Sequence, residues 1–84
     1  MPWHLTPRER RLLNLRGRRL VQLPPPEQKA AADERIGGVR VGDLILLAAL
    51  RDLADQGNVV ALEFAERLAK RLEIDRARYS YRRN

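Results

Sequence analysis

The chain has 84 residues and a mass of 9.7 kDa, which suffices for one small hydrophobic core and excludes a second domain. With 44% hydrophobic and 33% charged residues, its composition is that of a globular protein rather than of a disordered chain. Cysteine is absent, and histidine and serine occur once each, as His4 and Ser80. We therefore expect a protein that is not an enzyme, with no catalytic residue, no cofactor and no metal site.

Positive charge is concentrated at both ends of the chain. The net charge is +6, and the isoelectric point is near 11. Residues 1–23 carry six arginines and one glutamate, residues 76–84 carry four arginines and no acid, and residues 24–75 carry seven cations and ten acids. Arginine predominates over lysine, which suits phosphate and carboxylate binding, although genome-wide base composition produces the same preference. The sequence therefore predicts an anionic partner.

A basic helix is predicted over residues 7–16. Thr6 and Glu9 have the spacing of a capping box, and Pro7 stands at the first helical position, where its fixed φ suits a helix. Gly17 is expected to take the left-handed conformation just past the last turn. Arginines line one side of this helix, and its apolar face consists of Leu12, Leu13 and Leu15.

A less regular region is expected next. Residues 18–23 alternate imperfectly and lead into prolines, which favours an extended arm or an edge strand. A helix is predicted over residues 26–36, because this segment is rich in alanine and charged helix formers and stops at Gly37-Gly38. A short extended link over residues 39–41 follows, and Asp43 is expected to cap the next helix.

Two helices, over residues 44–56 and 58–73, are predicted to form an antiparallel hairpin. The first begins with seven apolar residues, which a helix tolerates on every side only where it is surrounded. Gly57 and Asn58 have the composition of a tight connection between helices. In the second helix, apolar residues recur at 3.6-residue spacing, at Ala61, Phe64, Ala65, Leu68 and Leu72. The predicted fold over residues 1–84 is a mostly α, single-domain helical bundle built on this hairpin.

The function predicted from these features is nucleic-acid binding by the two basic ends. The tail of residues 76–84 interleaves two tyrosines with four arginines, which offers stacking surfaces for bases and charged hydrogen bonds for phosphates. The alternative for this tail is that its tyrosines fold back on the hairpin and its arginines only solubilise it. The N-terminal helix adds further arginines along one surface. The candidate nucleic-acid-binding residues are Arg8, Arg11, Arg16, Arg18, Arg19, Arg76, Arg78, Tyr79, Tyr81, Arg82 and Arg83.

Residues 69–79, Ala-Lys-Arg-Leu-Glu-Ile-Asp-Arg-Ala-Arg-Tyr, resemble the second half of a helix-turn-helix motif. A small residue, a leucine, a turn and an isoleucine are followed by a polar helix. The resemblance implies a DNA-binding regulator in which Arg76, Arg78 and Ser80 face the major groove. It also implies that Tyr79 packs inward.

A protein partner is the alternative to nucleic acid. A small helical adaptor or inhibitor would grip an acidic protein with its basic ends and use the three leucines of the N-terminal helix as groove anchors. The apolar run at residues 44–50 also suggests a homodimer in which Leu46 or Leu50 is buried against its copy.

No segment of the sequence has the pattern of a membrane anchor or a targeting signal. No uncharged run exceeds seven residues, whereas a helix needs about 20 apolar residues to cross a bilayer. We therefore expect a cytoplasmic protein with no membrane partner.

Overall fold

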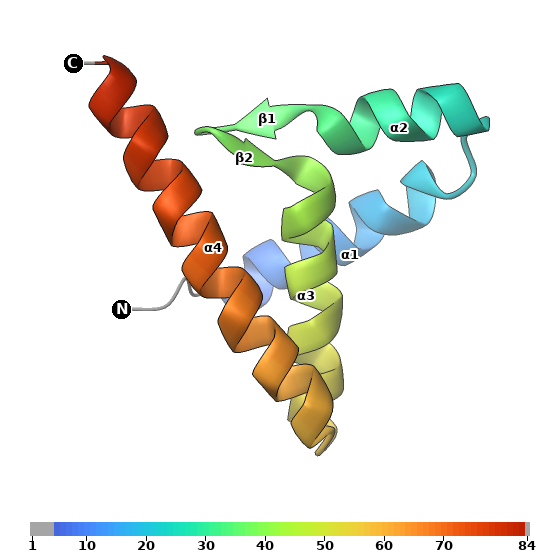
Figure 1. The fold of residues 1–84 in the computed structure, drawn as a ribbon. Coiled ribbons are helices and arrows are strands. Elements are labelled where there is room, and N and C mark those ends of the chain that lie inside the picture. Colours follow the sequence, from blue (N-terminus) through green and yellow to red (C-terminus); the bar gives the residue numbers. More distant parts are fainter. Residues whose placement is uncertain (1–4, 84) are drawn as a thin grey trace.

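Helices make up 78% of the chain, which confirms the mostly α fold predicted from the sequence. The structure is a computed structural model that describes residues 5–83, with side chains described up to Arg78. Figure 1 shows α3 and α4 joined at one end of a V, α1 crossing behind α3, and α2 leading into a two-stranded hairpin. The elements are α1 (Pro7–Leu20), α2 (Pro25–Asp33), β1 (Arg35–Ile36), β2 (Val39–Arg40), α3 (Val41–Asp55) and α4 (Val59–Arg83).

The predicted antiparallel hairpin of helices is formed by α3 and α4 (Figure 1). Gly57 ends α3 with a φ of 96°, a backbone conformation that residues with a side chain rarely adopt. Asn58 caps α4, because its Oδ1 accepts a hydrogen bond of 3.0 Å from the backbone N–H of Ala61. The connection has three residues, and at Gly57 and Asn58 it has the chemistry that the sequence indicates.

The hydrophobic core lies mainly between α3 and α4, and small residues make up much of it. Leu47 of α3 and Leu72 of α4 are fully buried, together with three alanines, Ala48, Ala65 and Ala69. The predicted core face of α4 is confirmed except at one position. Phe64, which was expected inside, is 52% exposed, because the small core residues bring α3 and α4 close together and leave its ring at the edge of their contact.

The α1 helix is longer than predicted and packs across α3. It runs through Gly17 to Leu20, so the expected end at residue 16 and the extended segment over residues 18–23 are both wrong. Gly17 lies inside the helix, because a Cβ atom at this position would come within 2.7 Å of Cγ2 of Ile45 on α3. The glycine therefore permits a close approach of two helices and does not terminate the first.

The segment between α1 and α3 contains a second helix and a small β-hairpin. The helix α2 begins at Pro25 and ends at Asp33, three residues earlier than expected, because β1 then pairs antiparallel with β2. Gly37 and Gly38 have φ angles of 61° and 84°, which are suited to the tight turn of such a hairpin. The predicted extended link at residue 39 is thus one strand of this hairpin.

The start of α3 also differs from the prediction. It begins at Val41, so Asp43 lies in the first turn rather than at the cap. Its carboxylate contacts Arg40 at 3.8 Å and Arg71 of α4 at 3.2 Å. Asp43 therefore links the start of α3 to β2 and to α4 through ion pairs.

The helix α4 continues without interruption from Val59 to Arg83. The turn required by the helix-turn-helix resemblance at residues 69–79 is absent, so that assignment is wrong. The expected end at residue 73 and the separate tail at residues 76–84 are also wrong up to Arg83, whereas Asn84 lies outside the described residues. The physical reason is that residues 59–83 contain no glycine or proline, and Glu73 is a good helix former. Within the described residues, no helix has the length and apolar character needed to cross a membrane.

Candidate nucleic-acid interface

The basic helix α1 is fixed at its start by the predicted capping box. The Thr6 backbone N–H donates to Oε1 of Glu9 at 3.0 Å, and the Glu9 backbone N–H donates to Oγ1 of Thr6 at 3.2 Å. The hydrogen bond from the Thr6 backbone, and then that from its side chain, lower the pKa of the Glu9 carboxyl. The negative charge of Glu9 also lies at the positive end of the helix dipole, which further stabilises the first turn.

The inner side of α1 is fastened to α3 by polar contacts and by the close approach at Gly17. Arg10 forms ion pairs with Asp52 at 3.4 Å and with Asp55, and the Asn14 side-chain amide donates a hydrogen bond to Asp52. Leu13 packs partly buried against the core. These contacts determine which side of α1 remains at the surface.

The outer side of α1 carries four arginines, Arg8, Arg11, Arg18 and Arg19, all of which are exposed. Within the described part of the chain, no carboxylate lies within ion-pairing distance of any of the four. At 1.5 Å per residue they span about 16 Å of helix, and the angular spacing of an α-helix places them within about 100° of its circumference. We call these four side chains the α1 arginine face.

Two leucines accompany the α1 arginine face. Leu12 and Leu15 are exposed, although the sequence analysis placed them with Leu13 on an apolar face. The reason is geometric: α1 meets α3 through a narrow strip around Arg10, Asn14 and Gly17, and only Leu13 lies at its border. The groove-anchor role proposed for these leucines thus applies to an outward surface of α1.

Arg16 differs from the other candidates on α1. Its Nη2 atom lies 3.0 Å from Oε2 of Glu34, at the end of α2. Its charge is therefore already neutralised within the chain. Arg16 is half-exposed and connects α1 to α2, so a structural role accounts for it without a ligand.

At the other basic end, Arg76 lies next to the start of α1. It lines a hollow of about 410 Å³ together with Leu5 and Glu9 at the start of α1 and with Ile36 and Gly37 at the hairpin turn. The structure thus brings the first turns of α1 and the C-terminal part of α4 together across this hollow, although the two segments lie far apart in the sequence. Arg76, from the basic C-terminal segment, and the first turn of α1 are therefore neighbours.

The remaining candidates on α4 are less well placed to act together. Arg78 is exposed, but it follows Arg76 by two residues and so points to a different side of the helix. The helical backbone extends through the last four candidates, whose side chains lie outside the described part of the structure: Tyr79, Tyr81, Arg82 and Arg83.

Two arginines in the middle of the chain, Arg40 and Arg71, contact carboxylates, and neither is among the candidates predicted from the sequence. Arg40 donates to Asp33 at 2.6 Å and lies 3.8 Å from Asp43, which also contacts Arg71. The hydrogen bond to Asp33, and then the charge of Asp43, raise the pKa of the Arg40 guanidinium above its usual value. Arg40 and Asp43 are only three residues apart, whereas the other two pairs join different elements and have no local signal in the sequence. These two paired arginines differ in this respect from the four of the α1 arginine face.

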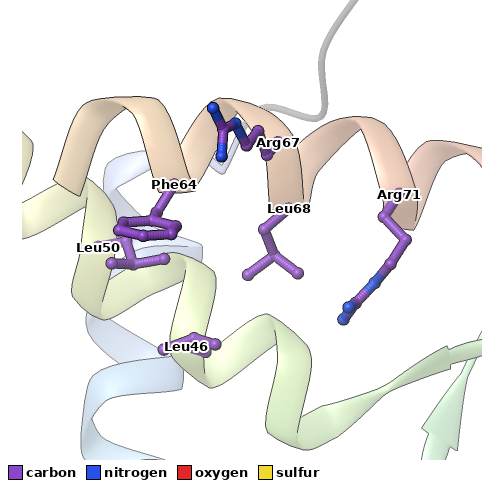
Figure 2. Close-up of a pocket in the computed structure, with 6 residues that line it drawn as sticks. All are labelled: Leu46, Leu50, Phe64, Arg67, Leu68 and Arg71. Carbon is purple, nitrogen blue, oxygen red and sulfur yellow. The ribbon is translucent and has the colours of Figure 1, made fainter. Parts of the chain in front are cut away.

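A groove between α3 and α4 is a second surface (Figure 2), and the sequence indicated only its α3 side, through the expected homodimer contact of Leu46 or Leu50. Its volume is about 480 Å³, and Figure 2 shows Phe64 beside Leu50, with Leu68 and Arg71 pointing from α4 toward α3. The signal in the sequence is the spacing of four residues between Leu46 and Leu50 on α3 and between Phe64 and Leu68 on α4. We define the α3–α4 groove by its lining residues, Leu46, Leu50, Phe64, Arg67, Leu68 and Arg71.

Comparisons with models of protein families, with curated proteins and with solved structures find no match to this chain. Within residues 5–83, no cluster of three or more histidine, aspartate or glutamate side chains could hold a metal ion. The paired carboxylates Asp52 and Asp55 instead bind Arg10. The geometry and charge of the surface are therefore the basis for the function proposed below.

Proposed function

We propose that this protein binds nucleic acid without catalysing a reaction, mainly through contacts from the α1 arginine face to the phosphate backbone. One observation carries the proposal: these four arginines lie on one side of a rigid helix and have no carboxylate neighbour among the described residues. Exposed guanidinium groups held in this way bind phosphates and displace the counterions that surround nucleic acid.

The C-terminal part of α4 would extend the same surface. Arg76 lies beside the start of α1, and the helix continues to Arg83, so a backbone that follows α1 would next meet the arginines of α4. Tyr79 and Tyr81, on the last turns, are candidates for stacking on exposed bases. Phosphate contacts of this type favour affinity over base specificity.

The test is a binding titration with labelled duplex DNA, single-stranded DNA and RNA of equal length, at about 50 mM and about 200 mM salt. The wild-type protein should lose affinity steeply between the two salt concentrations. A double variant, Arg11→Gln with Arg19→Gln, should bind more weakly and should flatten the plot of log K against log salt by up to about 1.8 units on duplex DNA, because each lost phosphate contact removes about 0.9.

The matched control is Lys29→Gln with Arg35→Gln, which removes the same charge from exposed positions on α2 and the β-hairpin. This control should leave the salt dependence close to that of the wild type. Equal weakening by both double variants would show that net charge, rather than the α1 arginine face, determines binding. Affinity weaker than about 10⁻⁴ M for all three nucleic acids at the lower salt concentration would refute the proposal.

A protein partner is the second candidate function, and exposed apolar side chains favour it. Leu46 and Phe64 line the α3–α4 groove with about half of their surface accessible to solvent, and Leu12 and Leu15 are exposed on α1. Phosphate groups gain nothing from such side chains, whereas a protein surface would remove them from water. Both a heterologous partner and self-association satisfy this observation, and the two differ in the occupant of the groove.

A further inference from the structure

We infer that the α3–α4 groove is occupied by a second copy of the same chain, so that the protein forms a twofold-symmetric dimer through α3 and α4. The inference develops the self-association alternative and does not depend on nucleic-acid binding. Leu46 is 50% exposed and Phe64 is 52% exposed, although both line the groove between the two longest helices of the fold. Exposed large apolar side chains clustered in a groove mark an interaction surface.

The apolar residues of the groove have the spacing found where helices pack against further helices. On α3, Leu46 and Leu50 are four residues apart, and on α4 Phe64 and Leu68 have the same spacing. This spacing is that of a seam along which helices pack into bundles. Within the described structure, α1 covers another side of α3, and no element covers this seam. Two copies would place four helices around one shared apolar layer.

The size of the surface fits a small but specific dimer. The 15-residue α3 is about 22 Å long, and two adjacent helices together are about 20 Å wide. The projected area of this face is therefore on the order of 440 Å². Because side chains make the surface uneven, the accessible surface that each copy buries is larger than this projection, and it approaches the value of about 600 Å² per partner at which specific interfaces begin. Obligate homodimers bury much larger surfaces, so we expect a reversible association rather than a permanent dimer.

The charges at the groove are self-complementary. Arg71 is already neutralised by Asp43 at 3.2 Å, so Arg67 is the remaining cation of the groove lining. Glu63 precedes Arg67 by one helical turn on the same side of α4. When two copies of α4 lie antiparallel, in contact through the exposed side that carries these two residues, Glu63 of each copy faces Arg67 of the other. A twofold axis forms this pair twice, as an isologous interface requires.

A second copy is also favoured by the composition of the core. Among the residues whose side chains the structure describes, four of the ten buried hydrophobic residues are alanines, so this part of the chain buries few large side chains for its length. Small domains of this kind commonly gain stability by oligomerisation. A copy of the same chain is present at the same concentration wherever the protein is made, whereas the supply of another partner varies.

The test is sedimentation equilibrium of the full chain from about 1 µM to about 500 µM, a range that brackets micromolar association. The average mass should rise from 9.7 kDa toward twice that value. Leu46→Gln should shift the dissociation constant at least tenfold upward. The matched control is Leu15→Gln, because Leu15 is a leucine on α1 with a similar exposure of 45%, and it should leave the mass unchanged. Circular dichroism checks that both variants remain helical.

Exchanging the charges of Glu63 and Arg67 tests the proposed antiparallel arrangement of the two α4 helices. Arg67→Glu alone should weaken the dimer, because it places two acids opposite each other, and Arg67→Glu combined with Glu63→Arg should restore it. Raised salt should change the dimer only modestly, because it screens both the repulsion between two copies of charge +6 and the attraction within the two Glu63–Arg67 pairs, whereas the same change steeply weakens nucleic-acid binding. A monomer throughout the concentration range, or equal effects of Leu46→Gln and Leu15→Gln, would overturn the inference. Failure of the charge exchange would overturn the antiparallel pairing.

Discussion

Replacement of Gly17 by alanine should destabilise the protein, although alanine is normally the better helix former. Inside a helix, Gly→Ala stabilises by about 0.5–1 kcal/mol. Here the new Cβ would come within 2.7 Å of Cγ2 of Ile45, closer than real Cβ contacts allow. Overpacking of this type costs about 1–3 kcal/mol, and the β-branched Ile45 side chain has little rotamer freedom within α3. The balance is a net loss of about 0–2.5 kcal/mol, measured by urea unfolding followed by circular dichroism.

The same substitution in a second variant shows whether contact with Ile45 or backbone strain at Gly17 causes the loss of stability. Ile45→Leu removes Cγ2 and keeps the volume of the side chain, so Gly17→Ala introduced into it should instead stabilise by about 0.5–1 kcal/mol. If Gly17 were a left-handed helix terminator, alanine would destabilise equally in both backgrounds, because the strain would lie in its own backbone. Stabilisation of the otherwise wild-type chain by Gly17→Ala would refute the close approach of α1 and α3.

Two further predictions concern stability. Leu47→Ala and Leu68→Ala should each lower the free energy of unfolding by about 2–5 kcal/mol, because both side chains lie in the core, and urea-unfolding losses below about 1 kcal/mol at both positions would contradict this packing. Thr6→Ala should cost about 0.5–2 kcal/mol through loss of the helix cap, and no change in unfolding would contradict the capping box. Since the pKa of Glu9 is lowered in the folded state, the stability that its carboxylate contributes is present above the unfolded pKa and is lost as the pH falls through the folded one. The main cause of the lowered pKa is the backbone N–H of Thr6, which alanine keeps, so the cost of Thr6→Ala should change little in acid.

Elements that depend on neighbouring residues could be predicted from the sequence. The capping box at Thr6 and the Gly57–Asn58 connection each lie within a few residues, and the structure contains both as expected. The core face of α4 followed from its 3.6-residue period, because a helix must bury one side. Phe64 lies at the border of that side, and whether such a residue is buried depends on how closely the partner helix approaches.

The errors arose where distant residues decide the outcome. Gly17 has the composition of a helix end, but its packing partner, Ile45, lies on another helix and is not visible in the local sequence. The end of α4 was predicted too early because a charged segment was interpreted as a tail, although it contains no residue that stops a helix. The α1 arginine face was identified as basic from composition alone. Its distinction from Arg16, which contacts Glu34, required the tertiary structure.

The chain of ion pairs from Asp33 through Arg40 and Asp43 to Arg71 has a consequence for the kinetics of folding. It connects the end of α2, the β-hairpin, the start of α3 and the middle of α4, which are separated by up to 38 positions. The α3–α4 pair is joined by a connection of three residues, so it closes a short loop and is expected to form first. The ion pairs then form after the main barrier has been crossed. We therefore expect Asp43→Asn to accelerate unfolding while leaving the folding rate nearly unchanged.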